Sequence, residues 1–285
     1  MTRIKESVVL ITGGASGIGK LMGQKCLQQG ATHLLIWDVD PVSLQAVTEE
    51  LSAAEHQVHP YLVNIADTAQ VQQAAQQVLQ EFGAPNIVIN NAGIVVGKPF
   101  VEHTMQEIER TLQVNVLGMM AVTHAFLPAM LERRQGHFVN IGSAAGMLPN
   151  PRMSVYAGSK WAVLGWSESL RLELEQIAPG LHVTTVTPSY IDTGMFAGVK
   201  APFLTPILQP HTIADAILRA VEQNQILLRK PFIVNLLPLL RGLLPTRMFD
   251  TIAGKWFGVY TSMSGFTGRT APEHSRTGTN LPEKL

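Results

Sequence analysis

Seven short apolar runs alternate with longer stretches of helical periodicity, and this alternation restricts the possible folds more than any other feature. Several runs are apolar at every position, as in strands that are buried on both faces of a parallel sheet. The order predicts an α/β, doubly wound parallel sheet of about seven strands with helices on both faces. The runs are Val8–Thr12, Leu34–Asp38, Val58–Val63, Ile87–Asn90, Phe138–Ile141, Val183–Thr187 and Phe232–Leu236. The helical stretches are Gly17–Gln29, Pro41–Ala54, Thr68–Phe82, Thr104–Glu132, Ser154–Ile177 and Thr212–Gln223.

Two local signals refine the fourth helical stretch. Thr104 followed by Glu107 predicts a capping box, in which each side chain binds the other residue's backbone N–H. Pro128 lacks an N–H and clashes with the preceding turn, so we expect a kink or an early end of the helix there.

Composition excludes several classes of protein. Of the 285 residues, 46% are hydrophobic and 15% are charged, which fits one well-buried domain and excludes intrinsic disorder. Basic and acidic residues number 21 each, whereas a protein that wraps nucleic acid is normally basic, so no nucleic-acid partner is expected. Cys26 is the one cysteine, so no intramolecular disulfide can form. No metal site is expected, because the nine histidines show no ligand spacing.

The charge is distributed unevenly. Residues 1–225 hold 13 basic and 18 acidic side chains, a net of −5, and residues 226–285 hold 8 basic and 3 acidic ones, a net of +5. We expect a catalytic domain over residues 1–235, an apolar basic extension over 236–266 and a flexible polar tail over 267–285. The extension can serve as a lid, a subunit interface or an interfacial membrane contact.

No targeting signal is expected at the N-terminus, because a glycine-rich turn follows the first apolar run at once. The most apolar stretch elsewhere, Ile226 to Leu244, is interrupted by three basic residues, by prolines and by Asn235, so it does not resemble a membrane span. These features predict a cytoplasmic protein, with peripheral membrane contact left open.

The turn after the first apolar run has the properties of a phosphate-binding loop. Its glycines follow the spacing G-x-x-x-G-x-G before a predicted helix, rather than G-x-G-x-x-G. Glycine lets the backbone turn sharply and approach a ligand, and the helix N-terminus offers N–H groups to a pyrophosphate. An ordinary strand-to-helix turn is the alternative. The residues expected to bind the cofactor here are Gly13, Ser16, Gly17, Ile18 and Gly19.

Asp38 ends the second apolar run, about 20 residues after the glycine turn, where a carboxylate can accept hydrogen bonds from the adenosine ribose. The same carboxylate would repel a 2′-phosphate, and no Arg or Lys occupies Gly14 to Gly19 or Val39 to Val42. This pattern favours NAD over NADP. In the alternative interpretation, Asp38 only caps the next helix.

Tyr156, Lys160 and Ser143 form a candidate catalytic set. Tyr156 and Lys160 are four residues apart on a predicted helix, so they share a face. A phenol is a poor base at neutral pH, and a nearby ammonium is expected to lower its pKa enough for proton exchange with a substrate hydroxyl. Ser143 follows the fifth apolar run, where sheets of this type place their ligand sites, and its hydroxyl can hold the substrate oxygen.

With these motifs the chain resembles the short-chain dehydrogenase/reductase family, whose members have a Rossmann-type fold. The matching features lie between residue 7 and about residue 225: Thr12 to Gly19, Asn90-Asn91-Ala92-Gly93, Asn115, Ser143, Tyr156-Ala-Gly-Ser-Lys160 and Pro188-Ser189 with Thr193. The resemblance implies that Tyr156 is the catalytic acid/base and that Lys160 also binds the nicotinamide ribose. It further implies that Ser143 orients the substrate and that Asn115 supports a proton-relay water. For Asn115, a solvent-facing polar residue is the alternative.

The resemblance also implies further cofactor contacts. The segment Asn91, Ala92 and Gly93 would line the cofactor cleft, with a simple turn as the alternative. Pro188, Ile191 and Thr193 would flank the nicotinamide. At Asn64-Ile65 the sequence departs from the family, which usually has Asp to meet the adenine amino group. The Asn64 carbonyl can still accept that bond, although a neutral hydrogen bond is weaker.

The loops around this site are apolar, which favours a small lipophilic alcohol or carbonyl substrate. Simple coverage of the core is the alternative. The expected substrate-binding residues are Ser143, Met147, Met153, Tyr156, Tyr190 and Phe196. The chain is also similar to the retinol and 17β-hydroxysteroid dehydrogenase branch, through Phe126 to Met130, Ser143 to Gly146 and the apolar C-terminus.

Three functions remain open at this point. The first is an NAD-dependent oxidoreductase of lipophilic alcohols, ketones or aldehydes. The second is an NADP-dependent reductase of polar or acyl-carrier substrates, and the third is a non-catalytic dinucleotide-binding regulator. A pure binder needs no set of Ser143, Tyr156 and Lys160, so these residues favour catalysis. The resemblance implies a homodimer or homotetramer, and Trp161, Leu164 and Leu172 could supply its apolar contact.

Overall fold

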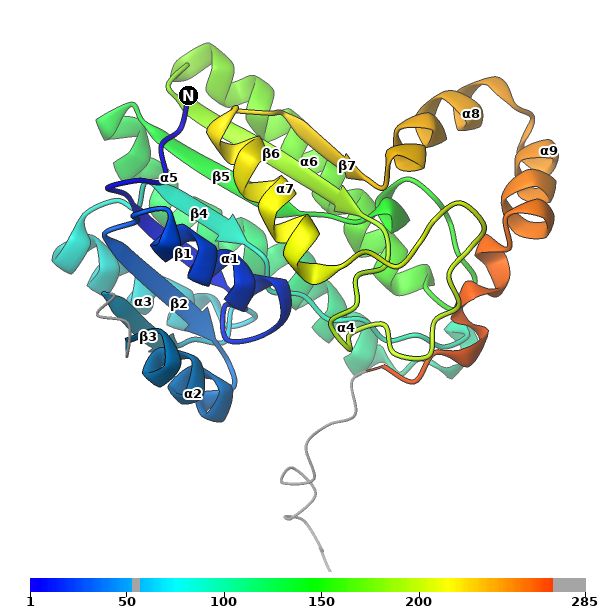
Figure 1. The fold of residues 1–285 in the computed structure, drawn as a ribbon, viewed down its shortest axis with the longest axis horizontal. Coiled ribbons are helices and arrows are strands. Elements are labelled where there is room, and N and C mark those ends of the chain that lie inside the picture. The colour runs from blue at the N-terminus through cyan, green and yellow to red at the C-terminus, as the bar shows by residue number, and fades with distance from the viewer. Residues whose placement is uncertain (53–56, 269–285) are drawn as a thin grey trace, which may run out of the picture.

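The computed structural model of the chain describes residues 1–52 and 57–268. Seven strands form one sheet in the order β3-β2-β1-β4-β5-β6-β7, and every neighbouring pair is parallel (Figure 1). The order reverses between β1 and β4, which creates the crevice where doubly wound sheets bind ligands. The strands are β1 (Val8–Thr12), β2 (His33–Asp38), β3 (Val58–Leu62), β4 (Ile87–Asn90), β5 (Gly136–Ile141), β6 (Leu181–Pro188) and β7 (Leu227–Lys230).

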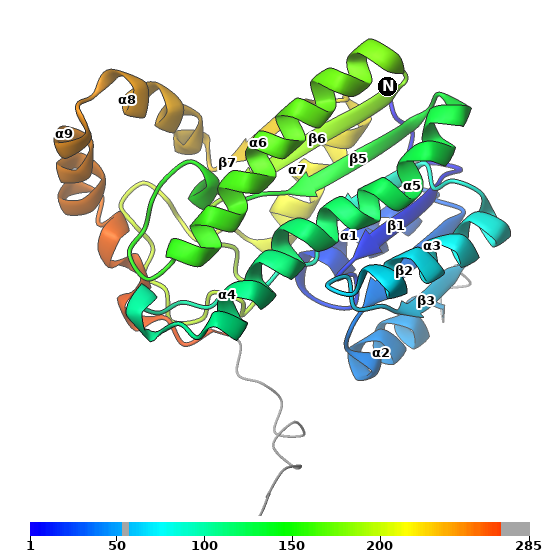
Figure 2. The ribbon, with the colours of Figure 1, turned by 180° about the vertical axis from the view of Figure 1, so that it is seen from behind.

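Helices cover both faces of the sheet. On one face lie α1 (Gly17–Gln28), α2 (Pro41–Ser52) and α7 (Pro210–Glu222), and on the other lie α3 (Thr68–Phe82), α5 (Met119–Arg133) and α6 (Ser154–Ile177) (Figures 1 and 2). Each helical layer forms its own hydrophobic core with the sheet. The predicted doubly wound α/β architecture is therefore confirmed. Residues 53 and 54, at the end of the predicted second helix, lie outside the described residues.

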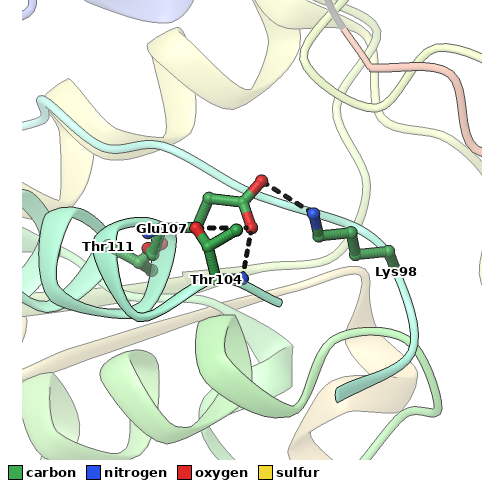
Figure 3. Close-up of polar contacts among 4 residues, drawn as sticks. All are labelled: Lys98, Thr104, Glu107 and Thr111. Carbon is green, nitrogen blue, oxygen red and sulfur yellow. Dashed lines mark hydrogen bonds and ion pairs between the residues drawn. The ribbon is translucent and has the colours of Figure 1, made fainter. Parts of the chain in front are cut away.

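The predicted capping box is present at the start of α4 (Met105–Leu112). The Glu107 N–H donates to Thr104 Oγ1 at 3.2 Å, and the Thr104 N–H donates to Glu107 Oε2 at 2.8 Å (Figure 3). The ammonium of Lys98 donates to the other Glu107 oxygen at 2.8 Å. Together these hydrogen bonds, led by that of Lys98, lower the pKa of Glu107 to about 2.

The predicted helix over 104–132 is one helical segment with an irregular turn inside it. A π-helical turn, Gln113–Gly118, separates α4 from α5. Pro128 lies inside α5, which continues to Arg133, so the early end expected at this proline is wrong. Within the described residues, Met105–Arg133 passes a length and hydropathy test for a membrane span, with a mean hydropathy of 1.6. Core helices of soluble proteins pass the same test, and α5 packs on the sheet through Val122, Phe126 and Met130.

The last strand lies earlier than predicted. β7 comprises Leu227–Lys230 and pairs with Thr185 to Pro188 of β6, whereas Phe232–Leu236 forms a 3₁₀ helix. Pro231 intervenes, and its nitrogen cannot donate to the ladder. Leu228 is buried against the sheet, whereas Phe232 is 76% exposed. The strand predicted at 232–236 is therefore wrong.

The chain beyond β7 extends past the edge of the sheet (Figure 1). It comprises α8 (Leu237–Leu243), α9 (Thr246–Asp250), a π-helical turn (Thr251–Trp256) and a 3₁₀ helix (Val259–Gly265). The predicted flexible tail, 267–285, lies outside the described residues apart from 267 and 268.

Candidate active site

The carboxyl ends of six adjacent strands, β3-β2-β1-β4-β5-β6, meet at one edge of the sheet. The loops that follow β1, β2, β3, β4, β5 and β6 line a cleft of about 660 Å³. This cleft collects residues that lie far apart in sequence, which is the arrangement expected at a topological switch point. The predicted site residues that line it are Gly13, Ser16, Gly17, Ile18, Asp38, Asn64, Ile65, Asn91, Ala92, Gly93, Ser143, Tyr156, Lys160, Pro188, Ile191, Thr193 and Phe196.

The glycine turn has the form of a cradle without side chains. Gly13 and Gly17 adopt φ values of +62° and +56°, which favour glycine. A Cβ atom on Gly19 would lie only 2.2 Å from the Gly13 carbonyl oxygen, so no side chain fits there. Gly19 does not line the cleft itself and instead permits the close approach of helix and turn. The geometry fits a pyrophosphate at the N-terminus of α1.

Asn91 and Thr12 hold the cradle to the neighbouring strand. The Asn91 amide donates to the carbonyl oxygens of Thr12 and Gly13, both at 3.0 Å. Thr12 Oγ1 accepts the N–H groups of Asn91 and Ala92, both at 3.1 Å. These four hydrogen bonds hold the glycine turn in place without a ligand. Asn91 therefore supports the turn after β1 and is not only part of the turn after β4.

Asp38 is anchored at the adenosine end of the cleft. Its carboxylate accepts hydrogen bonds from the N–H groups of Ala15 at 3.0 Å, Val39 at 2.8 Å and Asp40 at 3.2 Å. Asp38 therefore ties the glycine turn to the end of β2. Among the described residues that line the cleft, the basic ones are Arg110 and Lys160, on α4 and α6.

Asn64 lines the cleft where the family pattern has Asp. Its side-chain oxygen accepts the Ala66 N–H at 3.1 Å, and its N–H donates to Gln70 Oε1 at 3.0 Å. The carboxamide is thus held in place by its own loop. One lone pair of the side-chain oxygen remains for a further donor.

Tyr156 and Lys160 are buried side by side on the first turns of α6, and both line the cleft. Burial raises the pKa of Tyr156 to about 12, while a hydrogen bond with the Ser143 side chain acts in the opposite direction. Burial also lowers the pKa of Lys160 to about 8. The Lys160 ammonium donates to the Ile141 carbonyl at 2.8 Å and lies 5.8 Å from the centroid of the Tyr156 ring.

The expectation that Lys160 lowers the pKa of Tyr156 is therefore not met. The ammonium is directed to a backbone carbonyl of β5, and desolvation of the phenol outweighs the groups that favour phenolate. At neutral pH, Tyr156 carries its proton. In this state the Tyr156 hydroxyl can donate a hydrogen bond.

Asn115 lies in the π-helical turn and is fully buried, so a solvent-facing role is excluded. Its Oδ1 accepts the Ile94 N–H at 2.8 Å, and its Nδ2 donates to the Ile94 carbonyl at 2.9 Å and to Ser159 Oγ at 3.0 Å. Asn115 therefore joins the helix to the loop after β4 and to α6. Asn115 does not line the cleft itself but lies next to Gly93, which does. A Cβ atom added to Gly93 would lie 3.3 Å from Asn115 Oδ1 and 3.8 Å from Lys160 Nζ, so Gly93 separates these two side chains closely.

A second, apolar cavity of about 100 Å³ meets the cleft at Ser143 and Ser189, which line both. Its wall combines the loop after β5, the loop after β6 and the chain beyond β7. The hydrophobic lining residues include Leu148, Met153, Leu237, Leu240, Phe249 and Phe257. A lipophilic molecule in this cavity would have its polar end beside Ser143.

The predicted substrate residues are partly brought together. Met153 and Tyr190 line the apolar cavity, and Phe196 lies edge-on to Tyr156 and Tyr190, with ring centroids 6.0 and 5.2 Å away. Met147 lies apart from them. It is absent from the lining of both cavities, and its carbonyl accepts a hydrogen bond from Arg241 at 2.8 Å.

Sequence reasoning missed a polar cluster beside this site. The Tyr190 hydroxyl lies 2.8 Å from Ser262 Oγ, and the Asn150 carboxamide lies within 3.0 Å of both hydroxyls. Ser262 belongs to the chain beyond β7, and neighbouring Met263 packs with Met153 and Tyr156. No local signal could have revealed this cluster, since Asn150 and Ser262 are 112 residues apart.

Within residues 1–52 and 57–268, no group of three His, Cys, Asp or Glu side chains is placed to hold a metal ion.

Comparison with known proteins agrees with this geometry. A family model described as short chain dehydrogenase matches residues 7–202. Short-chain dehydrogenase/reductase 3 of Homo sapiens is 35% identical over 264 residues, which cover 92% of this chain and 87% of the relative. Epidermal retinol dehydrogenase 2 of Mus musculus is 37% identical, with 93% and 87% covered. Estradiol 17-beta-dehydrogenase 11 of Rattus norvegicus is 32% identical, with 87% and 83% covered.

Solved structures share the fold. A metagenomic short-chain oxidoreductase in complex with NADP is 27% identical with a TM-score of 0.68, and 79% of this chain and 97% of that chain are covered. A short chain dehydrogenase/reductase from Burkholderia phymatum in complex with NAD has a TM-score of 0.76, with 95% and 99% covered. At 23% identity, the latter supports the fold alone.

The fold and the site define an NAD(P)-dependent oxidoreductase that acts on CH–OH groups or the corresponding carbonyls. The chain belongs to the short-chain dehydrogenase family.

Proposed function

We propose that the protein is an NAD-dependent oxidoreductase that interconverts lipophilic alcohols and their ketones or aldehydes. One observation carries the proposal: Ser143 lies at the junction of the dinucleotide-sized cleft and an apolar cavity, and the protonated Tyr156 lines the cleft beside it. The relatives named for retinol and estradiol support the same substrate class.

The residues of this chain divide the chemistry among them. Reduction of a carbonyl requires a hydride at carbon and a proton at oxygen, and the reduced nicotinamide supplies the hydride when it is bound. Ser143 orients the carbonyl oxygen, and Tyr156 donates the proton to it. Lys160 holds a positive charge near the phenol, and Asn115 positions α6 through Ser159. In the direction of alcohol oxidation, Tyr156 must instead take up the proton as phenolate.

For the cofactor, the glycine turn, Asn64-Ile65 and Asn91 to Gly93 would hold the adenosine and pyrophosphate side. Pro188, Ile191 and Thr193, with Lys160, would hold the nicotinamide side. The cradle at Gly13 and Gly17 fits a pyrophosphate, because no side chain occupies it. NAD is proposed over NADP because the anchored Asp38 carboxylate repels a 2′-phosphate.

The proposed function is tested with a panel of alcohols and carbonyls of rising chain length, assayed by absorbance of the reduced cofactor with NAD and NADP in parallel. We expect catalytic efficiency to rise with chain length, because each buried CH₂ contributes about 0.8 kcal/mol. An optimum at short, polar or acyl-carrier substrates with NADP would favour the second candidate function. Cofactor binding without turnover of any substrate would favour a regulator.

Asp38→Ala is expected to lower the preference for NAD over NADP at least about tenfold, because it removes a like charge from the 2′-phosphate site. The measurement is kcat/KM for both cofactors. Asp40→Ala is the matched control: this nearby carboxylate accepts hydrogen bonds from the Val42 N–H and the Ser43 hydroxyl in the first turn of α2, and its loss should leave the preference unchanged. A wild-type enzyme that already prefers NADP would refute the role of Asp38.

A homodimer, or a tetramer built from it, is proposed from the exposed apolar side chains of α4 to α6. Met105, Leu117, Trp161 and Leu172 are all exposed. Leu164 does not join them, because its Cδ1 lies against Gly142 and Gly146 of its own chain. These exposed positions suit an isologous contact across a two-fold axis.

Leu117→Asp is therefore expected to halve the mass measured by light scattering at micromolar concentration, because it buries a charge in the interface. Val42→Asp, on the opposite face and 75% exposed, is the control and should change nothing. A wild-type monomer at this concentration would contradict the proposal.

For its location, a cytoplasmic protein with peripheral membrane contact is proposed. Its support is the exposed apolar and basic surface of the chain beyond β7.

A further inference from the structure

The segment from Phe232 to Phe257, called here the C-terminal arm, has two apolar faces. Its inner face walls the apolar cavity through Val234, Leu237, Leu240, Phe249, Ile252, Ala253 and Phe257. The arm projects from the edge of the sheet, with α8 and α9 at its far end (Figures 1 and 2). Its inner face thus lines the cavity. The arm lies beyond the edge strand β7 rather than on a face of the sheet (Figures 1 and 2).

The outer face is apolar as well. Phe232, Leu243 and Trp256 are 76%, 71% and 71% exposed. Leu236, Leu239 and Met248 are also exposed. A helix that is apolar all round normally lies in a protein core or in lipid, and large exposed apolar patches mark interaction sites.

Basic residues alternate in sequence with these exposed apolar ones, and Arg247 and Lys255 are exposed. Residues 229–257 contain Arg229, Lys230, Arg241, Arg247 and Lys255 against one acidic residue, Asp250. Asp250 accepts a hydrogen bond from the Tyr260 hydroxyl at 2.7 Å. Arg241 is engaged by its own chain: its guanidinium lies 4.4 Å from the centroid of the Trp161 ring and donates to the Met147 carbonyl. In the described part of the chain, no ion pair engages Arg247 or Lys255.

The cavity reaches the surface beside the arm. Phe203 lines the cavity and is also 66% exposed. Its ring centroid lies 6.1 Å from that of Phe257 in the arm, and its N–H donates to the Phe257 carbonyl at 2.8 Å. The exposed end of the cavity at Phe203 therefore adjoins the arm.

We propose that the C-terminal arm docks on an anionic lipid bilayer and that the cavity opens onto this docked surface, so that a lipophilic substrate passes from the lipid to Ser143. Apolar and aromatic side chains with bordering cations are what an interfacial segment presents to such a bilayer. A protein partner bound to this face would cover the cavity opening at Phe203. A bilayer would also cover the apolar face, but it can itself dissolve the lipophilic substrate. The delivery step rests on the proposed function.

Docking is tested by flotation of the full chain with vesicles of phosphatidylcholine, with and without phosphatidylserine. We expect the wild type to float with the anionic vesicles. Leu243→Glu with Trp256→Glu should weaken this binding at least about tenfold, because two apolar anchors are lost. Ile177→Glu is the matched control: it is 63% exposed at the far end of α6 and should bind as wild type.

Arg247→Glu with Lys255→Glu is a second, independent variant. It should reduce binding to anionic vesicles at least about tenfold, and added salt should reduce wild-type binding in the same way. A wild type that floats with neither vesicle overturns the proposal. So does a light-scattering mass that halves in Leu243→Glu with Trp256→Glu, because the arm would then be a subunit interface.

Delivery is tested by turnover of a long-chain alcohol dissolved in the vesicles against a short, water-soluble alcohol. Leu243→Glu with Trp256→Glu should lower turnover of the vesicle-borne substrate at least about tenfold and leave the soluble one unchanged. Equal turnover of the vesicle-borne alcohol by variant and wild type would overturn delivery from lipid. If the wild type oxidises neither alcohol, the proposed function fails, and the flotation result still decides the docking.

Discussion

Tyr156→Phe is expected to lower turnover at least about a hundredfold while cofactor binding is retained. The ring keeps its packing against Phe196 and Met263, and only the hydroxyl that exchanges a proton with the substrate is lost. General acid–base groups typically contribute factors of about 10² to 10⁴. The measurement pairs steady-state turnover with titration of cofactor binding by fluorescence.

Tyr190→Phe is the matched control for this variant. Tyr190 lines the adjoining apolar cavity, and its hydroxyl bonds to Asn150 and Ser262. We expect its turnover to stay within about tenfold of wild type, since no proton-transfer group is removed. A Tyr156→Phe enzyme with turnover within a few-fold of wild type would remove Tyr156 from the proposed role.

The pKa of Tyr156 also sets an expected pH dependence. Because the pKa is raised to about 12, the phenol is protonated across the neutral range. Carbonyl reduction uses this protonated form, so its rate should not increase with pH there. Alcohol oxidation uses the phenolate, whose fraction increases about tenfold per pH unit below the pKa, so its rate should rise with pH.

Lys160→Met is expected to abolish most turnover and, at the same time, to stabilise the fold. Burial lowers the pKa of the folded-state ammonium from 10.5 to about 8, so the charged form is penalised in the protein. Removing the ammonium relieves this penalty but leaves the Ile141 carbonyl without its donor, which costs about 1 kcal/mol or more. The net gain in free energy of unfolding at pH 7 should be about 1 to 2 kcal/mol.

The sign of this effect can be followed with pH. Between the folded pKa of about 8 and the unfolded value of 10.5, the unfolded state binds more protons. The contribution of Lys160 to the free energy of unfolding therefore becomes less unfavourable as the pH rises through this window. The difference between Lys160→Met and wild type should shrink over the same range in thermal unfolding.

Lys5→Met is the control, because Lys5 has a side chain that is 76% exposed. We expect its free energy of unfolding to change by less than about 0.5 kcal/mol. If Lys160→Met keeps its turnover, or if it destabilises the protein at pH 7 while retaining its fold, the buried-charge account of Lys160 is wrong.

The sequence by itself determined the layered architecture and most of the cleft. Strand and helix periodicities, the glycine spacing and the Thr104–Glu107 cap are local signals, because each reflects the conformation of a few adjacent residues. Parallel strands bring their carboxyl ends together by topology, so the predicted strand order alone places Ser143, Asp38 and Asn91 at one edge. The four-residue spacing likewise placed Tyr156 and Lys160 on one face of a helix.

The tertiary structure decided what depends on packing between distant segments. Residues 232–236 form the more apolar run, but the Leu-Leu-Arg-Lys segment at 227–230 pairs with β6 and is the strand. The direction of the Tyr156 pKa depends on how many segments exclude water from the phenol, and Met263, which packs against it, is more than 100 residues away. The cluster of Asn150, Tyr190 and Ser262 and the two apolar faces of the arm arise in the same way. Desolvation and long-range contact are properties of the folded surface, and no sequence window contains them.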